Sequence, residues 1–408
     1  MNHDSISRRQ MLLGLLASGA GLALAACGGA SPTSSAPAVS TPASAKPATS
    51  AAASPAASSA AKPAAGGSAA GIATTWDDLV AAAKKEGKVV VNGPPDPKVR
   101  DQLPAAFKAK FGIEMEFLGG NSSQLAARVD GERKAGQYTV DASVSGSDTM
   151  FDSFLRNGWL DPLKPSLLLP DTADNAKWKT GSPWFRDPKK DTVMQIFNTI
   201  QHFLAINTQL VAVKDVPTAD ALLDPKWKGK ICAYDPSVNG AGIAIASAVY
   251  VAKGEDFATK LYKGQNVTLT RDYSQLADWV AHGSYPIGLA ATTNYLQPFV
   301  KAGIPIEQPE LPDAPSALGG GFGDVAIWNK APHPNAARVF ANWIASKEGI
   351  EVYGPTQTQV SVRTDVDNSW APPQDIPQPG IKYLDTYDYD FEEGPRLKIR
   401  AFFAKLLK

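Results

Sequence analysis

Cysteine is nearly absent from this chain, which has two among its 408 residues. Cys27 lies in an N-terminal segment that we expect to be processed, so Cys232 has no partner within the chain. Disulfide scaffolding and cysteine metal sites are therefore both excluded. Cys232 stands in the apolar run 231–234, where we expect a buried small side chain and not a reactive thiol.

The chain also has no excess of basic over acidic residues, or of acidic over basic residues. Lys and Arg number 40, Asp and Glu number 40, and the formal net charge is zero. This balance argues against a nucleic-acid binder, which normally carries a basic excess. The histidines of the main part of the chain, His202, His282 and His333, have no second His or Cys at the spacing of metal ligands.

Motifs of catalysis are missing as well. The sequence contains no Gly-x-Ser-x-Gly elbow, no His-Glu-x-x-His helix, no phosphate-binding loop and no dinucleotide fingerprint. Paired carboxylates such as Glu392 and Glu393 lie in a polar, aromatic tail, where we expect them to be solvated. We therefore predict a binding protein without a cofactor, and not an enzyme.

The N-terminal residues 1–26 have the pattern of an export signal. Arg8 and Arg9 precede an apolar run that ends at Ala26 and Cys27. The run is shorter than the roughly 20 residues that span a bilayer. The pattern resembles a bacterial twin-arginine signal joined to a lipoprotein cleavage site, so we expect lipidation of Cys27 and anchoring to the outer face of the cytoplasmic membrane. The alternative is an ordinary cleaved signal with an accidental cysteine.

Residues 27–72 are almost entirely Ala, Ser, Pro, Thr and Gly after the cysteine, with Lys46 and Lys62 as the only charges. Such a stretch has too few apolar side chains to offset the entropy of ordering the chain. We expect a disordered tether with a reach of roughly 35 to 40 Å. A glycosylated stalk is the alternative.

The remaining residues, 73–408, are too many for one hydrophobic core and suit two lobes. Short apolar runs alternate with helical patterns, which predicts an α/β fold with largely parallel strands. A long apolar segment, 193–210, is expected to cross from the first lobe to the second. The glycine-rich run 319–323 is either the hinge of a return crossing or a flexible surface turn. The expected strands are 88–92, 113–117, 140–144, 230–234 and 286–290, and the expected helices are 76–86, 99–111, 123–135, 149–157 and 241–252.

Four segments resemble, in order, a known family. They are 222–237, with its Asp-Pro-Lys-Trp-Lys-Gly-Lys string, 276–288, 331–338 and 343–349. The likeness is to bacterial extracellular solute-binding proteins of ABC transporters, iron(III)-type group. It implies an α/β, two-lobed type II periplasmic-binding-protein-like fold with an interlobe ligand cleft, and an ABC permease as partner. We expect one lobe from 73–203 and 318–360, and the other from 204–317 and 361–408.

Four turns that begin predicted helices are rich in Gly, Ser, Thr and Asn. In open α/β sheets, ligands bind beyond the carboxyl ends of strands, where helix N-termini present unpaired N–H groups. Each turn alone is explained as a helix cap, but their recurrence in both lobes favours a shared site. The expected ligand-binding residues are Gly120, Asn121, Ser122, Ser145, Gly146, Ser147, Ser237, Asn239, Gly240, Arg271, Thr293, Asn294 and Tyr295.

Tyr295 bears on the choice of ligand. In ferric members of the resembled group, adjacent tyrosines near this position bind iron, but here Leu296 follows Tyr295. We therefore predict a small polar or anionic solute, no bound metal and a monomer that delivers the solute to a membrane permease. Ferric-iron binding is one alternative, and a lipoprotein enzyme or sensor that acts on a small molecule is the other.

Overall fold

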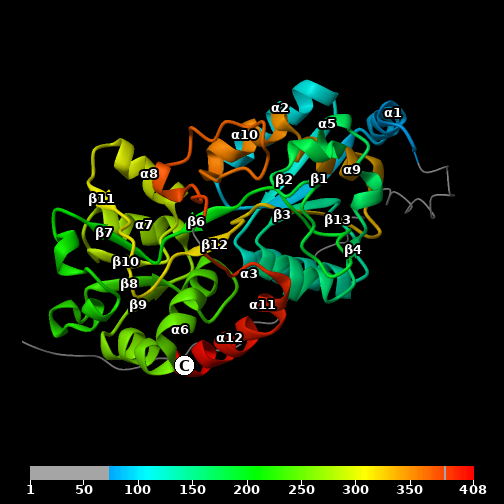
Figure 1. Cartoon of the computed structure of the whole chain (residues 1–408). Coiled ribbons are helices and arrows are strands. Elements are labelled where there is room, and N and C mark those ends of the chain that lie inside the picture. The colour runs from blue at the N-terminus through cyan, green and yellow to red at the C-terminus, as the bar shows by residue number, and fades with distance from the viewer. Residues whose placement is uncertain (1–72, 381–382) are drawn as a thin grey trace, which may run out of the picture. The chain divides into compact units, whose positions relative to one another are not determined.

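The computed structural model describes residues 73–380 and 383–408 (Figure 1). The expected signal segment 1–26, the lipidation site Cys27 and the tether 27–72 lie outside the described residues. Within the described part of the chain, no helix is long and apolar enough to cross a membrane.

The helices that the sequence predicts at 76–86, 99–111, 123–135 and 241–252 are confirmed to within a few residues at their N-terminal ends. The segment 149–157 is wound mainly as a π-helix, Met150–Leu155, which directly continues α4. The helices are α1 (Trp76–Glu86), α2 (Pro97–Phe111), α3 (Ser122–Lys134), α4 (Ser147–Thr149), α5 (Pro170–Ala173), α6 (Ala241–Thr259), α7 (Tyr273–Ala281), α8 (Thr293–Lys301), α9 (Pro334–Ile344), α10 (Lys347–Gln357), α11 (Tyr389–Glu393) and α12 (Pro395–Leu406).

The strands form three sheets, and the five predicted strands are among them. The strands are β1 (Lys88–Gly93), β2 (Glu114–Gly119), β3 (Ala142–Ser145), β4 (Leu160–Asp161), β5 (Met194–Gln195), β6 (Thr199–Gln201), β7 (Leu204–Asn207), β8 (Ile231–Tyr234), β9 (Thr268–Thr270), β10 (Ile287–Leu289), β11 (Ile306–Glu307), β12 (Ala317–Gly319), β13 (Asp324–Trp328) and β14 (Leu384–Asp385).

The first sheet has the order β2-β1-β3-β13-β4, with β5 paired to β13. Its first three strands are parallel, as the alternation of strands and helices predicts. Phe107 of α2 packs against Phe340 and Trp343 of α9, with ring centroids 6.0 and 5.4 Å apart. The buried carboxylate of Asp141 accepts a hydrogen bond from the Val90 N–H at 2.7 Å and so fixes the entry to β3. We call this sheet and its helices the first lobe.

The second sheet has the order β11-β7-β10-β8-β9, in which β8, β9 and β10 are parallel. Cys232 of β8 is fully buried, which confirms the expectation of a structural side chain. Burial raises the pKa of its thiol to about 12. The second core includes α6 and α7, and it also includes residues of α12 from the end of the chain. We call this sheet and its helices the second lobe.

A small third sheet, β14-β12-β6, contains strands of the segments that connect the other two sheets (Figure 1). The crossing expected at 193–210 is confirmed, because β5 belongs to the first sheet, β6 to the third and β7 to the second. The glycine-rich run 319–323 connects β12 of the third sheet to β13 of the first. Gly319, Gly320 and Gly323 are buried, so this run is not a flexible surface turn.

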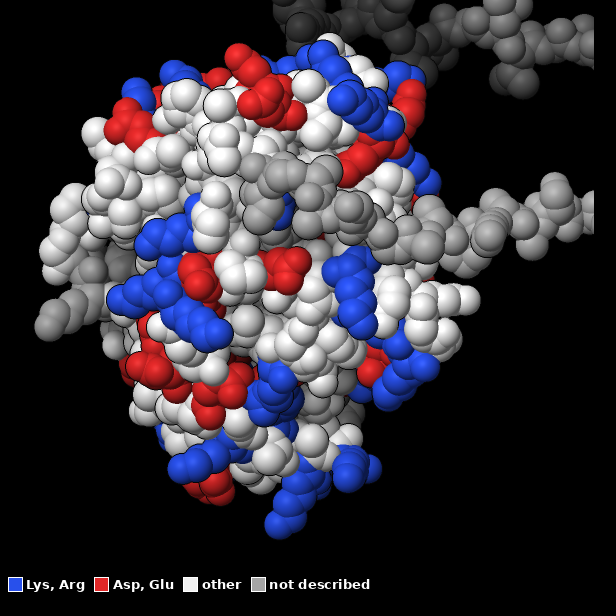
Figure 2. All heavy atoms as spheres, turned by 90° about the vertical axis from the view of Figure 1, so that its right-hand side faces the viewer, with Lys and Arg blue, Asp and Glu red and all other residues white. Residues whose placement is uncertain are grey.

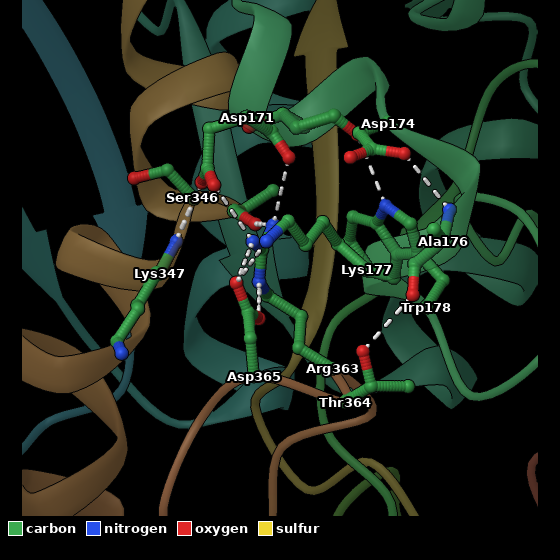
Figure 3. A network of polar contacts seen from close by, with 12 residues as sticks. Asp171, Asp174, Ala176, Lys177, Trp178, Ser346, Lys347, Arg363, Thr364 and Asp365 are labelled. Atoms are coloured by element: carbon green, nitrogen blue, oxygen red, sulfur yellow. Dashed lines mark hydrogen bonds and ion pairs between the residues drawn. The ribbon is translucent and has the colours of Figure 1, made fainter.

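Arg363 fastens the segment that follows α10 to the first lobe (Figure 3). Its side chain is fully buried, and two of its nitrogens lie 2.9 Å from the carboxylate oxygens of Asp365. A further contact of 2.9 Å joins its guanidinium to Asp171. Val362 and Val366 belong to the first core. The lobe boundaries expected from the sequence stay a prediction.

The C-terminal helices pack on both lobes. Tyr389 of α11 lies against Phe151 of the first lobe, with ring centroids 5.3 Å apart, and Phe403 of α12 lies 5.1 Å from Tyr262 of the second. The expectation of a solvated tail is wrong for Glu392, which is fully buried and pairs with the buried Arg396 at 3.3 Å. Long-range packing, which local polarity does not reveal, buries this pair.

Lys and Arg residues alternate with Asp and Glu over the face of the protein shown in Figure 2. No large area of a single charge stands out on that face. Its mixed surface agrees with the equal numbers of acidic and basic residues in the sequence.

Candidate functional site: a ligand cleft

A small cavity of about 40 Å³ lies between the two lobes. Its wall contains residues of α3 and α4 from the first lobe, of α6, α7 and α8 from the second, and of the segments that cross between them. The lining residues are Ser122, Gly146, Asp148, Gln201, Gly240, Ala241, Tyr273, Thr292, Asn294, Tyr295, Gly321, Phe322, Gln357, Gln359 and Tyr387.

Each of the four predicted turns contributes to this wall. Ser122 is the first residue of α3, Gly146 and Gly240 directly precede α4 and α6, and Asn294 and Tyr295 lie in the first turn of α8. The structure therefore brings together at one cavity turns that are widely separated in sequence. Their convergence agrees with the topology, because α4 follows β3, and α6 follows β8, after a connection at the carboxyl end of the strand.

Of the predicted residues outside the cavity wall, Asn121 and Arg271 lie in the wall of a neighbouring groove, which shares Tyr273 and Tyr295 with the cavity. Asn121 caps α3 by accepting a hydrogen bond from the Gln124 N–H, and its Nδ2 donates to the Arg271 carbonyl at 3.2 Å. The Arg271 guanidinium is paired with Asp235, with Nη2 2.8 Å from Oδ2. Arg271 is thus already engaged by a carboxylate and is not a free countercharge.

The remaining predicted residues do not line the cavity. Ser145 and Ser147 are fully buried, and their hydroxyls have no hydrogen-bond partner among the described residues. The Ser237 hydroxyl donates to Asp235 at 2.6 Å, and the Thr293 hydroxyl donates to Gln308 at 3.0 Å. The Ser237 and Thr293 hydroxyls thus support turns around the cavity.

Two glycines among the predicted residues are explained by close packing. A Cβ on Gly120 would lie 3.0 Å from a methyl carbon of Leu125. Gly240 has a φ of 135°, and a Cβ there would lie 3.0 Å from the Tyr273 hydroxyl. Gly240 is therefore a position where a side chain is strained by conformation as well as by space.

Asp148 is one of the cavity-wall residues that sequence reasoning missed, although it follows Ser147 directly. It is 2% exposed, and its Oδ2 accepts a hydrogen bond from the Gly240 N–H of the opposite lobe at 2.5 Å. Its main-chain carbonyl lies 3.5 Å from the Asn239 side-chain nitrogen. Gly240 has no side chain to cap α6, so Asp148 caps that helix from across the cleft. Burial raises the pKa of Asp148, and the charges of Arg396 and Arg400 oppose this rise.

Stacked tyrosines form the second feature of the wall. The rings of Tyr234 and Tyr273 stack with centroids 4.3 Å apart, and the rings of Tyr273 and Tyr295 follow with centroids 5.3 Å apart. Phe322, from the glycine-rich run, meets Tyr273 edge-on at 6.3 Å. Phe322 is a lone aromatic residue among glycines in the sequence, and that signal points to a site where backbone and ring approach a ligand.

The crossing segments add amide and phenol groups to the wall. Gln201 of β6 lies 3.4 Å from the Tyr387 hydroxyl, and Gln359 has a buried side-chain oxygen without a partner in the described structure. Local sequence patterns gave no sign of these residues, since Tyr387 reaches the cavity only through the packing of the C-terminal segment.

The pair of adjacent tyrosines that binds iron in ferric members of the resembled group is not present at Tyr295. Leu296, which follows Tyr295, is buried in the second core. Burial raises the pKa of Tyr295 above its usual value, which disfavours the phenolate form that binds iron. Among residues 73–380 and 383–408, no three His, Cys, Asp or Glu side chains are grouped so as to hold a metal ion.

A family model described as a bacterial extracellular solute-binding protein matches residues 88–354, which include both sheets and most of the cavity wall. The chain belongs to this family. The family match therefore confirms that this chain resembles bacterial extracellular solute-binding proteins, as its sequence motifs predicted. An uncharacterized protein of Haemophilus influenzae is 24% identical over 342 residues, which are 80% of this chain and 89% of that protein.

Solved structures confirm the two-lobed fold of this solute-binding protein. The periplasmic binding protein AfuA from Actinobacillus pleuropneumoniae, with fructose-6-phosphate bound, has a TM-score of 0.61 at 20% identity, covering 78% of this chain and 97% of AfuA. Iron-bound HitA from Pseudomonas aeruginosa has a TM-score of 0.56 at 17% identity, covering 78% and 99%. A substrate-binding protein of an ABC transporter from Agrobacterium tumefaciens has a TM-score of 0.60 at 17% identity, covering 79% and 94%. At these identities the likeness shows the fold alone.

Proposed function

We propose that this solute-binding protein is the extracytoplasmic component of an ABC importer, which binds a small polar solute between its lobes and hands it to a membrane permease. The observation that carries the proposal is the convergence of the four turns, two from each lobe, on one cavity. Binding and release, without covalent chemistry, are its whole activity in this proposal.

Closure of the lobes provides the mechanism. Asp148 and Gly240 meet across the cleft, and Asn121 meets the Arg271 carbonyl, so the described conformation has contacts that an open form would lack. A solute that touches both lobes stabilises the closed form by its difference in affinity for the two forms. The permease then recognises the closed form, and the crossing segments with their buried glycine-rich run act as the hinge.

Cys27 completes the proposal for the location of the protein. A lipid on Cys27 and the tether 27–72 would hold the lobes close to the permease, on the outer face of the cytoplasmic membrane. The support is the sequence pattern together with the extracellular character of the family. A monomer is sufficient, because both halves of the cavity come from one chain.

A thermal-shift screen tests the proposal. The purified protein is heated with organic acids, phosphonates, sugars, polyamines and ferric iron, each at several concentrations. A true solute present at 100 times its Kd adds about 2.7 kcal/mol to the free energy of unfolding. The variant Asn294→Ala, which removes a buried polar group of the wall, should lose the shift and keep its fold.

The outcome distinguishes the alternatives. A shift with ferric iron alone would favour an iron carrier, and turnover of a shifted compound would favour an enzyme. If no compound class gives a shift that depends on Asn294, the proposed function is wrong. A sensor is distinguished by its partner, since purified permease would then fail to bind the solute-loaded protein.

A further inference from the structure

The cavity wall has one charged side chain, a carboxylate. Of the described residues that line the cavity, Asp148 is the only Asp, Glu, Lys or Arg. A second carboxylate, Asp324, lies at the start of β13 opposite Ser145 of β3. Asp324 is fully buried, and neither of its carboxylate oxygens has a hydrogen-bond partner in the described structure. Asp324 does not line the cavity, and the described part of the cavity wall supplies no positive side chain to set against Asp148.

Burial raises the pKa of Asp148 and the charges of Arg396 and Arg400 lower it, and both arginines also pair with other carboxylates. Arg396 of α12 pairs with Glu392 at 3.3 Å, and Arg400 of the same helix pairs with Asp152. Neither arginine lines the cavity. Arg271, in the neighbouring groove, pairs with Asp235 at 2.8 Å. An anionic solute would thus meet the Asp148 carboxylate with no cation among the described residues of the cavity wall, and like charges repel strongly away from water.

Asp148 has capacity for another donor. One carboxylate oxygen accepts from its neighbour Thr149 at 2.8 Å and the other accepts from Gly240 at 2.5 Å. Each carboxylate oxygen accepts two hydrogen bonds. A positively charged donor would also favour the ionised form of Asp148. No described group of the cavity wall carries a positive charge that offsets the cost of burying this carboxylate.

Aromatic rings complete the surroundings of this carboxylate. Tyr273, Tyr295 and Phe322 line the same cavity as Asp148. Ring faces attract a positive charge, and a carboxylate beside aromatic rings is the arrangement that suits ammonium groups. The Tyr295 hydroxyl is buried and has no partner among the described residues, so it can accept a hydrogen bond from a guest.

From these contacts we infer that the solute is a small organic cation, an amine or a quaternary ammonium compound, and that Asp148 determines this specificity as its countercharge. The inference rests on the proposed function and narrows its solute class. It departs from the anionic solute that the helix N-termini suggested, because Asp148 already occupies the N-terminus of α6.

Isothermal titration of the full chain with matched probes tests the inference. Putrescine and choline are the cations, 1,4-butanediol and 3,3-dimethylbutan-1-ol are their neutral counterparts, and succinate and inorganic phosphate are the anions. We expect at least one cation to bind ten times or more tightly than its neutral counterpart. Asp148→Asn, which keeps the shape of the side chain, should remove most of that tenfold preference.

Two further variants keep the test decisive. Asp256→Asn removes an exposed carboxylate from the other end of α6, and it should leave every affinity unchanged. If Asp148→Asn does not fold, Phe322→Leu replaces it. This variant removes a ring from the wall and should weaken cation binding several-fold while it leaves binding of the neutral counterparts nearly as it was.

The outcomes separate this inference from the proposed function. Tightest binding of an anion, or of a neutral counterpart, would overturn the cation inference and leave the solute-binding function standing. Cation binding that Asp148→Asn leaves unchanged would overturn the role of Asp148. Absence of binding by all six probes would also overturn the inference, whereas the proposed function fails only if the wider screen finds no solute whose thermal shift depends on Asn294.

Discussion

His202 and Asp375 form a buried pair where the chain crosses between the lobes, with Nε2 of the imidazole 2.9 Å from Oδ1 of the carboxylate. Glu310 approaches the other ring nitrogen at 3.0 Å. Burial by itself lowers the pKa of His202, but the hydrogen bonds and charges of Asp375 and Glu310 outweigh it and raise this pKa to about 9. The crossing is thus held by a histidine that stays charged in the folded protein.

This pair predicts a loss of stability in alkali. The folded-state pKa of His202 lies above its ordinary value of 6.5, so its contribution is complete below pH 6.5 and is lost as the pH rises through about 9. The contribution is at most roughly 3 kcal/mol. Urea unfolding at pH 6, 7.5 and 9.5 measures it, and His202→Asn should flatten the dependence. The exposed His282 provides the control, since His282→Asn should leave the slope as in the wild type.

Gly319 predicts a steric effect. A Cβ at this position would overlap the ring of Tyr387, which is 4% exposed and has little room to move. Gly319→Ala should therefore lower the free energy of unfolding by about 2 kcal/mol. Gly131, inside α3, has no atom within 4 Å of the place that a Cβ would occupy, so Gly131→Ala should stabilise by up to about 1 kcal/mol. Equal effects of the two changes on urea unfolding would contradict this account.

We expect that lysine cannot replace Arg363, whose buried guanidinium contacts the carboxylates of Asp365 and Asp171. Arg363→Lys keeps the charge but loses the paired contacts to Asp365 and the contact to Asp171 (Figure 3). We expect a loss of about 1 to 3 kcal/mol in the free energy of unfolding. Lys177 lies 3.5 Å from the same Asp365 at the surface, and Lys177→Met should cost less than about 0.5 kcal/mol. A similar cost for both changes would show that burial does not matter here.

Glu392 and Arg396 predict strong coupling in the C-terminal segment. Both side chains are fully buried, so Arg396→Met should cost about 3 to 5 kcal/mol because an unpaired buried carboxylate remains. The double variant Glu392→Leu with Arg396→Met should recover much of this loss. Chemical unfolding of the two single variants and the double variant measures the coupling, and additive costs would refute it.

Much of the fold follows from local sequence. The Val-rich strand 88–92, the helix-starting turn at Asn121 and the glycine at 158, whose φ is 67°, act through neighbouring residues and could be predicted. Their outcome depends on chain stiffness, side-chain periodicity and hydrogen bonds within a few residues.

The chemistry of the cleft could be predicted only in part. The turns were recognisable, but Asp148 acquires its role from Gly240, which lies 92 residues away. Tyr387 and Glu392 depend on the docking of a polar C-terminal segment whose local pattern resembles a solvated tail. Contacts of this kind depend on which charged groups find buried partners, and sequence periodicity carries no information on that.

The central claim is that two lobes close on one solute, and a distance across the cleft tests it most directly. Spin labels are attached at Asp101→Cys on α2 and Lys301→Cys on α8, which are both exposed positions. The labelled protein also carries Cys27→Ser, and the remaining cysteine, Cys232, is buried and should not react with the label. Double electron–electron resonance should show a broad distribution of distances between the labels. The distribution should become narrower, and its mean distance shorter, when the solute with the largest thermal shift is added. An identical distribution with and without that solute would contradict the account.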